Sequence, residues 1–315
     1  MIQYLVVLLD DTSVSFCRYP NNKKERRLIP IDALKAGILY AMKENLNIQF
    51  VYPCYPLPKE HEETIEDIDH VKIKPAVYAD TADIVVFDNI EELKSFTSFS
   101  KENTYALRID KQSLFDKVTF VLPILYKVAR LNIIITDIEA FCDKDFKTYT
   151  DILQTLTEEV EKAYVAGTPV QLNLLTDRIM LDKMNNCGAG DTCITLAPDG
   201  RFYACPAFYL SDDGYAIGDL EHGLDIKNPQ LYGLNHAPIC RNCDAYQCKR
   251  CIWLNRKTTL EVNTPSHEQC VVAHLERSAS RILLQAIRKH GTFMSDKEDI
   301  KEIDYLDPFD VRNEW

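Results

Sequence analysis

The sequence has no hydrophobic run long enough to cross a membrane. A membrane-spanning helix needs about 20 consecutive apolar residues, whereas the apolar run at the start of the chain, Tyr4 to Leu9 together with Ile2, has seven. The same segment lacks the positively charged start and the small-residue cleavage site of a signal peptide. We therefore expect a soluble, cytoplasmic protein that has no membrane partner.

Positive charge is in deficit. The 315 residues include 36 Lys and Arg against 48 Asp and Glu, which gives a net charge of −12. A surface of this sign repels phosphate, so nucleic acid is excluded as the main partner. The sequence also lacks internal repeats and low-complexity tracts, and it offers no arguable Ser/His/Asp triad. Its seven histidines are not spaced as metal ligands beside the cysteines.

Short runs of Val, Ile and Leu alternate with helical patterns in the first 180 residues. Helical stripes are clearest over Leu34–Leu46 and Phe146–Tyr164, and the acidic run Glu60–Asp69 fits a short helix or a loop. Strands separated by crossovers pair in parallel, so the sequence predicts an α/β fold whose sheet is either doubly wound or curved into a partial barrel. Six strands are expected, at Gln3–Leu9, Asn47–Tyr52, Asp83–Phe87, Tyr105–Ile109, Asn132–Thr136 and Val170–Leu174.

An aspartate ends five of these strand-like runs. Ligand sites of parallel sheets lie at the carboxyl ends of the strands, so a ring of carboxylates there could hold a divalent ion or a cationic peptide. Alternatively, each side chain caps the helix or turn that follows its strand. The ring hypothesis predicts at least one carboxylate with a raised pKa or a bound cation. The five residues are Asp10, Asp88, Asp110, Asp137 and Asp177.

The eleven cysteines are distributed unevenly. Cys17, Cys54 and Cys142 lie in the first 186 residues, and we interpret them as bystanders. The other eight fall between Cys187 and Cys270. In a reducing compartment, cysteines at this density more often bind metal than form disulfides.

Local patterns suggest how the eight cysteines are arranged. The text around Pro198–Gly200 reads as a hairpin that brings Cys193 and Cys205 together. Further on, Ser266 and Gln269 have the spacing of a capping box, which opens a helix with Cys270 in its first turn. The neighbouring residues His267 and His274 are expected to be exposed or to donate hydrogen bonds, rather than to ligate.

Eight cysteines make two sets of four, and four thiolates suit either zinc or a four-iron four-sulfur cluster. The pairs Cys240/Cys243 and Cys248/Cys251 resemble zinc knuckles, but the four residues between them are few for a zinc ribbon. Local cations would offset the negative charge of iron–sulfur clusters. Spacing alone leaves both metals open. The cations are Arg241, Lys249, Arg250, Arg256 and Lys257.

The order of the cysteines resembles the SPASM/twitch extension of radical SAM enzymes. Cys187 is followed by twelve residues, Gly200, four residues and Cys205, and then by a four-cysteine group and a distant last cysteine. Two gaps, of four and two residues, are one shorter than usual. The resemblance implies two auxiliary four-iron clusters with full protein ligation. One would be held by Cys187, Cys193, Cys205 and Cys251, and the other by Cys240, Cys243, Cys248 and Cys270.

The resemblance further implies a six-unit radical SAM partial barrel before this extension, but the catalytic signature is broken. Radical SAM enzymes carry Cys-x-x-x-Cys-x-x-Cys after the first strand. Here Asp10 and Val14 stand where the first two cysteines belong, and only Cys17 survives. The Gly-Gly-Glu expected after the second strand is replaced by the run Tyr52–Pro56. We therefore expect neither SAM as a cofactor nor conventional radical SAM activity.

The whole chain resembles the CXXX repeat peptide maturase family, whose members are radical-SAM-like SPASM proteins. The resemblance implies a role in the maturation of a ribosomally synthesised cysteine-repeat peptide, with the precursor peptide as partner and a radical SAM enzyme or an electron donor as a second one. Two alternatives stay open: a non-catalytic scaffold with structural clusters, and a zinc-binding protein. The expected domains are a degenerate barrel at residues 1–180, a SPASM domain at 181–291 and an acidic tail at 292–315.

Overall fold

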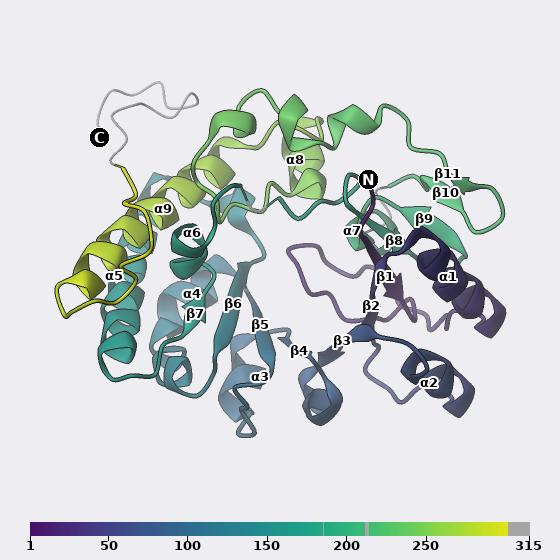
Figure 1. Cartoon of the computed structure of the whole chain (residues 1–315), viewed down its shortest axis with the longest axis horizontal. Coiled ribbons are helices and arrows are strands. Elements are labelled where there is room, and N and C mark those ends of the chain that lie inside the picture. The colour runs from purple at the N-terminus through teal and green to yellow at the C-terminus, as the bar shows by residue number, and fades with distance from the viewer. Residues whose placement is uncertain (185, 212–213, 302–315) are drawn as a thin grey trace. The chain divides into compact units, whose positions relative to one another are not determined.

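The computed structural model describes residues 1–184, 186–211 and 214–301 (Figure 1). They form two compact units. The first consists of Met1–Asp88, Asn186–Arg241 and Cys251–Thr264, and the second of residues 89–184, Asn242–Arg250 and the described residues from Pro265 onward. Each unit therefore combines segments from both sides of residue 180, and the three domain boundaries proposed above stay predictions. Most of the acidic tail, residues 302–315, lies outside the described residues.

The first unit contains a sheet with strand order β11-β10-β9-β8-β1-β2-β3-β4. Strands β8, β1, β2, β3 and β4 pair in parallel, whereas β9, β10 and β11 continue the sheet in antiparallel pairs. The strands are β1 (Tyr4–Leu8), β2 (Asn47–Val51), β3 (His70–Pro75), β4 (Ile84–Phe87), β8 (Cys193–Leu196), β9 (Arg201–Tyr203), β10 (Gly218–Asp219) and β11 (Gly223–Leu224).

Two helices of the first unit correspond to patterns in the sequence. The predicted helical stripe Leu34–Leu46 forms α1, and the acidic run Glu60–Asp69 contributes to a helix, α2, rather than to a loop. The α-helices are α1 (Ile31–Glu44), α2 (Lys59–Glu66), α7 (Pro206–Leu210) and α8 (Ile252–Thr259), and the 3-10 helices are η1 (Ala76–Thr81), η5 (Pro229–Leu231) and η6 (Leu234–His236). A further 3-10 turn, η7, covers Cys240–Asn242.

Strand β3 is a correction to the sequence analysis, which expected no strand between Asn47–Tyr52 and Asp83–Phe87. The strand contains two lysines and ends in proline, so it lacks the apolar run of its neighbours. It forms because parallel strands β2 and β4 flank it on both sides. Lys74 is nevertheless buried within it, and this burial lowers the pKa of its ammonium group.

The second unit contains the parallel strands β5, β6 and β7 and a layer of helices. Helices α5 and α9 lie side by side in Figure 1, and the Tyr149 hydroxyl on α5 donates to Glu276 Oε1 on α9 at 2.8 Å. The strands are β5 (Thr104–Ile109), β6 (Arg130–Ile135) and β7 (Gln171–Leu172). The helices are α3 (Ile90–Ser95), α4 (Lys111–Lys117), η2 (Val118–Phe120), η3 (Leu122–Tyr126), η4 (Ile138–Ala140), α5 (Asp143–Val165), α6 (Thr176–Met180) and α9 (His267–Arg288).

Side-chain caps define where several of these helices begin. The predicted cap of α9 is confirmed, because the Ser266 hydroxyl accepts the backbone N–H of Gln269 at 3.3 Å. Asn89 accepts two N–H groups at the start of α3. Such caps satisfy the N–H groups that have no partner within the helix. No helix among the described residues is both long and apolar enough to cross a membrane.

Asp145 stabilises the start of α5 and provides a test of the second unit. Its carboxylate accepts the Cys142 N–H at 2.9 Å and the Lys111 ammonium at 2.6 Å, and the bond from Lys111 is the main reason that its pKa is lowered from 3.8. A lowered pKa means that the contribution is complete above pH 3.8 and is lost as the pH falls through the lowered value. We expect Asp145→Asn to reduce the free energy of unfolding by about 1 kcal/mol at neutral pH.

The measurement is denaturant unfolding as a function of pH. The difference between Asp145→Asn and wild type should narrow in acid. Asp151→Asn, at an exposed position of the same helix, is the control and should change stability by less than about 0.5 kcal/mol. Equal effects of the two substitutions at neutral pH would contradict this account.

Candidate functional site

Asp10 begins the loop that follows β1, at a position where radical SAM enzymes carry a cysteine. Its hydrogen bonds hold this loop in a closed turn. This side chain is completely buried. Its Oδ1 accepts the backbone N–H of Thr12 at 2.8 Å and the Thr12 hydroxyl at 2.5 Å, and its Oδ2 accepts the Tyr55 hydroxyl at 2.7 Å. Asp10 therefore caps the turn that follows its strand, which is the capping alternative raised above. The Arg26 guanidinium lies 4.2 Å from the centre of the Tyr55 ring.

The next residue, Asp11, makes a second pairing of the same kind. The Tyr209 hydroxyl donates to its Oδ1 at 2.5 Å, and the Lys23 ammonium lies 4.8 Å from the Tyr209 ring centre. Burial raises the pKa of the Asp11 carboxyl, and the hydrogen bond from Tyr209 opposes this rise. The basic segment of Lys23 and Arg26 is thus held against the β1 loop by aromatic rings.

Tyr52, the first residue after β2, forms a third pairing. Its hydroxyl donates to Glu62 at 3.5 Å, and the buried Lys74 ammonium lies 4.0 Å from its ring centre. Lys74 also donates to the Thr81 hydroxyl at 3.0 Å. The two segments that would carry the cluster and cofactor motifs of a radical SAM enzyme are thus occupied by side chains that bind one another.

Three of the five strand-end aspartates belong to the second unit. Asp110 caps α4 by accepting the Ser113 N–H at 2.9 Å. Asp137 accepts the Lys111 N–H at 2.8 Å, and its pKa is raised mainly by burial, with a smaller contribution from the negative charge of Asp110. Asp177 pairs with Arg130 at 3.0 Å. The raised pKa that the ring hypothesis requires is present at Asp137, but burial is its main cause.

The link between Cys187 and Cys193 is a tight glycine turn. Gly188 has φ +71° and its carbonyl accepts the N–H groups of residues 191, 192 and 193. A Cβ at Gly188 would lie 1.9 Å from the Thr192 hydroxyl oxygen, and one at Gly190 would lie 2.4 Å from the Tyr232 ring. Only glycine fits both positions, so the turn is fixed by close packing.

The predicted hairpin is confirmed as β8 and β9. Thr195 pairs with Tyr203 and Leu196 with Phe202. Cys193 is the first residue of β8, and Cys205 follows β9 by two residues, so both lie at the open end of the hairpin.

Cys205 and Cys251 occupy the same position in their local structures, directly before the helices α7 and α8. Against the larger effect of burial, the backbone N–H of Ala207 lowers the pKa of Cys205, and the N–H groups of Trp253 and Leu254 lower the pKa of Cys251. Backbone N–H groups near a sulfur favour a thiolate over a thiol. A sulfur ligand of a metal or an iron–sulfur cluster needs this form.

Burial works in the opposite direction on these thiols. It raises the pKa of Cys205 well above its ordinary value, that of Cys193 to about 12 and that of Cys251 to about 11. The negative charge of Cys187 contributes to all three increases. The four cysteines of the first predicted set therefore act on one another electrostatically, and a positively charged centre would relieve both burial and repulsion.

The sequence analysis did not identify Cys17 and Arg18 as residues that act electrostatically on these thiols. Cys17 adds to the repulsion at Cys205, and the Arg18 guanidinium lowers the pKa of Cys251. Both follow the β1 loop and are far from the other cysteines in the sequence. No spacing rule connects them, because the contact arises only when the chain folds back.

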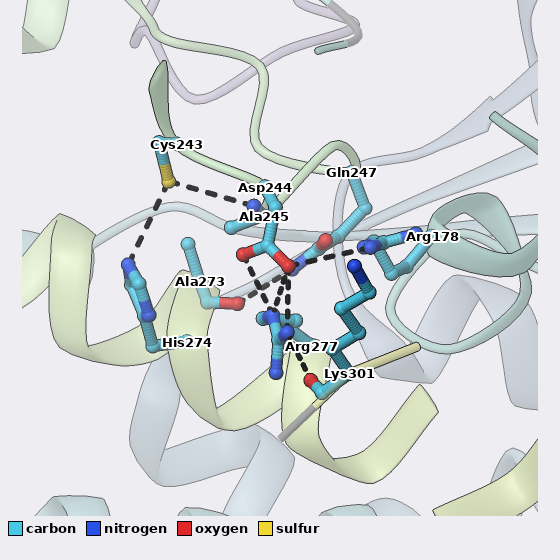
Figure 2. Close-up of polar contacts among 9 residues, drawn as sticks. All are labelled: Arg178, Cys243, Asp244, Ala245, Gln247, Ala273, His274, Arg277 and Lys301. Atoms are coloured by element: carbon cyan, nitrogen blue, oxygen red, sulfur yellow. Dashed lines mark hydrogen bonds and ion pairs between the residues drawn. The ribbon is translucent and has the colours of Figure 1, made fainter. Parts of the chain in front are cut away.

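The second predicted set is divided between the units. Cys240 belongs to the first unit, and Cys243, Cys248 and Cys270 to the second. The Cys243 sulfur accepts the Ala245 N–H at 3.4 Å and lies 3.7 Å from His274 Nε2, as Figure 2 shows. Burial raises the pKa of Cys243 to about 11, and the charge of Cys248 contributes. His274 thus contacts a predicted ligand. This contact agrees with the expectation that His274 forms a hydrogen bond and is not itself a ligand.

The cations expected to surround the clusters have other contacts as well. Arg256 lies over the rings of Phe208 and Tyr215, at 5.7 and 5.2 Å from their centres. Lys257 lies 5.3 Å from the Trp253 ring centre, and Lys249 lies 3.9 Å from Asp177.

The chemistry of the first cysteine set fits thiolate-bound metal, because four thiols whose negative charges repel one another would be stabilised by a positive centre. Within residues 1–184, 186–211 and 214–301, no three or more His, Cys, Asp or Glu side chains converge closely enough to hold a single metal ion. The eight ligand assignments stay predictions.

Neither a protein-family model nor a curated protein matches the sequence. Solved structures do match the fold. The structure "Native anSMEcpe with bound AdoMet and Cp18Cys peptide" has a TM-score of 0.61 and 12% identity, and the match covers 92% of this chain and 100% of that one. The Streptococcus suis structure "SuiB bound to precursor peptide SuiA" has a TM-score of 0.50 and 13% identity over 86% of this chain and 76% of that one.

Both neighbours are less than 25% identical to this chain, so the likeness is one of fold. The observed mixed α/β architecture with mostly parallel strands agrees with them, and the α/β fold class predicted from the alternating strand and helix patterns is confirmed. This chain shares the fold of the anSMEcpe and SuiB structures.

Proposed function

We propose that this protein takes part in the maturation of a ribosomally synthesised, cysteine-rich peptide. In this proposal it holds two four-iron clusters through eight cysteines and does not itself cleave SAM. Its partners are the precursor peptide and either a radical SAM enzyme or an electron donor.

The match to peptide-bound structures supports the peptide substrate. Two of the matching structures were solved with a peptide, the anSMEcpe structure with Cp18Cys and the SuiB structure with SuiA. Their folds align with most of this chain. A chain of this fold has a framework on which peptides are known to bind, and cysteine side chains of a precursor are natural partners for iron–sulfur chemistry.

The observation that carries the absence of SAM cleavage is the closed loop after β1. Asp10 is completely buried, and its two oxygens accept the Thr12 and Tyr55 donors. A radical SAM cluster would require three thiolates in this segment, where the chain has Cys17 alone. Removing a buried carboxylate from its hydrogen-bond donors is costly, which opposes rearrangement of the loop around a cluster.

The chemistry that the two auxiliary clusters would supply is one-electron transfer. The chain's own residues lower the cost of keeping thiolates buried, through the N–H donors at the starts of α7 and α8 and through Arg18 beside Cys251. With four cysteines per cluster no iron is open to substrate, which favours electron relay over substrate coordination. A scaffold with structural clusters would share every ligand but show no redox cycling.

The first test of this proposal is the identity of the bound metal. After anaerobic purification we expect about eight iron and eight sulfide per chain and a brown chromophore, because two four-iron clusters are expected. Iron and sulfide assays with visible absorption and EPR spectroscopy are the measurements. Replacing Cys205 and Cys251 with serine should remove one cluster, whereas Cys142→Ser, at an exposed position, should leave both. Two zinc ions without visible absorption would overturn the cluster proposal.

Cleavage of SAM is the second prediction. The reduced protein, incubated with SAM under anaerobic conditions, should release no 5′-deoxyadenosine above a protein-free control, because the loop after β1 lacks the thiolates that hold a SAM-binding cluster. Chromatography detects the product, and an active radical SAM enzyme assayed in parallel confirms the conditions. Sustained product formation would contradict the proposal that this chain does not cleave SAM.

Peptide binding is the third prediction. A fluorescent synthetic peptide of repeated Cys-x-x-x tetrads should bind saturably under anaerobic conditions, as measured by fluorescence anisotropy. A peptide of the same sequence with serine in place of cysteine is the control and should bind more weakly, because the serine hydroxyl lacks the apolar, polarisable character of a thiol. Equal binding of the two peptides, or no binding of either, would remove the proposed substrate class.

A further inference from the structure

The segment Asn242–Arg250, which carries two of the predicted ligands, is attached to the second unit by Asp244. Figure 2 shows the Asp244 carboxylate between two arginines. Arg277 Nε on α9 donates to both carboxylate oxygens, at 2.7 and 2.8 Å, and its Nη2 donates at 2.6 Å. Arg178 Nη2 on α6 donates at 3.4 Å. Both oxygens of Asp244 are therefore engaged by guanidinium groups.

The rest of the segment has further attachments to the same helices. Gln247 Nε2 donates to the Ala273 carbonyl on α9 at 2.6 Å. The Arg178 guanidinium lies 4.2 Å from the ring centre of Tyr246. Asp244, Tyr246 and Gln247 all lie between Cys243 and Cys248. The chain between the two cysteines is thus held on α6 and α9 at successive points.

The third cysteine of this unit lies on the helix that receives these contacts. Cys270, His274 and Arg277 are spaced by four and three residues, so they share one face of α9. Cys243 Sγ lies 3.7 Å from His274 Nε2. The segment therefore contacts α9 at His274, which is one helical turn after Cys270, and again at Arg277.

The Asp244–Arg277 pair is well suited to hold this geometry. Arg277 is 3% exposed, and a guanidinium that binds a carboxylate through two nitrogens fixes orientation as well as distance. Removal of one partner from a buried ion pair leaves the other charge uncompensated. An asparagine at position 244 could accept from one donor, but it would leave the buried Arg277 without its counter-charge.

We propose that Asp244 is the positioning residue of the second cysteine set: it binds no metal itself and, through Arg277 and Arg178, holds Cys243 and Cys248 against the helix that carries Cys270. This inference rests on the proposed function, in which these cysteines are ligands. It adds a residue that the cysteine spacing does not include. The Asp244–Arg277 contact joins sequence positions 33 residues apart.

The first test is selective loss of one cluster. Asp244→Asn, purified anaerobically, should hold about half the iron of the wild-type protein and lack one of two EPR signals, because two of the four ligands of that cluster are displaced. Asp244→Glu keeps the charge and should restore the iron. Asp225→Asn changes an exposed aspartate paired with Lys227 and should be indistinguishable from wild type. Full iron content and both signals in Asp244→Asn would overturn the proposal.

A second measurement separates positioning from general destabilisation. Asp145→Asn removes the contacts of Asp145 with Lys111 and with the Cys142 N–H at the start of α5, and these contacts involve no residue of the Asn242–Arg250 segment. It should lower thermal stability but keep both EPR signals. If Asp145→Asn and Asp244→Asn lose the same signal in proportion to their loss of stability, Asp244 has no specific positioning role.

A third measurement does not depend on which metal the protein holds. Iodoacetamide labelling of Cys243, mapped by mass spectrometry, should be about tenfold or more faster in Asp244→Asn than in wild type, because release of the segment exposes a thiol that is partly buried in the wild type. Asp244→Glu and Asp225→Asn should label at the wild-type rate. Equal rates in all four proteins would overturn the positioning role. Absence of iron from the wild type would instead overturn the proposed function.

Discussion

The parallel pairing of β8 with β1 is the contact on which the first unit depends. It runs from Tyr4 opposite Cys193 to Val7 opposite Leu196. Strand β1 also pairs with β2, so its residues from Leu5 to Leu8 are almost entirely buried, and the apolar side chains alone supply a large part of the stability of this unit. The pairing joins the start of the chain to the first cysteine strand, and from it follow both the closed β1 loop and the position of the hairpin.

The hydrogen bonds from Tyr55 to Asp10 and from Tyr209 to Asp11 show how this unit stabilises buried carboxylates. Asp10 and Asp11 are buried, and each accepts a tyrosine hydroxyl. A cation lies against the ring of each tyrosine. Hydrogen bonds to a buried carboxylate replace those lost from water, and the cations over the rings add attraction. The carboxylates are therefore part of the packed structure, which is a different role from an open ring that attracts a ligand.

The cysteines present the opposite electrostatic problem. Burial and mutual repulsion disfavour thiolates at Cys193, Cys205 and Cys251, while N–H groups at the starts of α7 and α8 favour them. A buried group held between these influences is adapted to a partner that carries positive charge. In the second unit Cys243 is subject to the same balance, because burial raises its pKa and the hydrogen bond from the Ala245 N–H lowers it.

The sequence by itself determined the elements whose signals are local. Runs such as Asn47–Tyr52, the stripe of α5, the turn at Pro198–Gly200 and the cap at Ser266 depend on neighbouring residues, and each was predicted close to its observed place. The alternation of apolar runs with helical patterns likewise predicted the α/β fold class. These signals survive because periodicity, turn chemistry and capping act within a few residues.

Only the tertiary structure decided the rest. Strand β3 forms between its two neighbours despite its lysines. Strand β8 pairs with β1 although residues 9–192 separate the two strands in the sequence. The partners of Asp10, Asp11 and Asp244 are 45, 198 and 33 residues away. Such contacts depend on burial and on chain return, which no local pattern encodes. The local sequence therefore determined where the helices, strands and turns form, and packing decided which distant side chains act on one another.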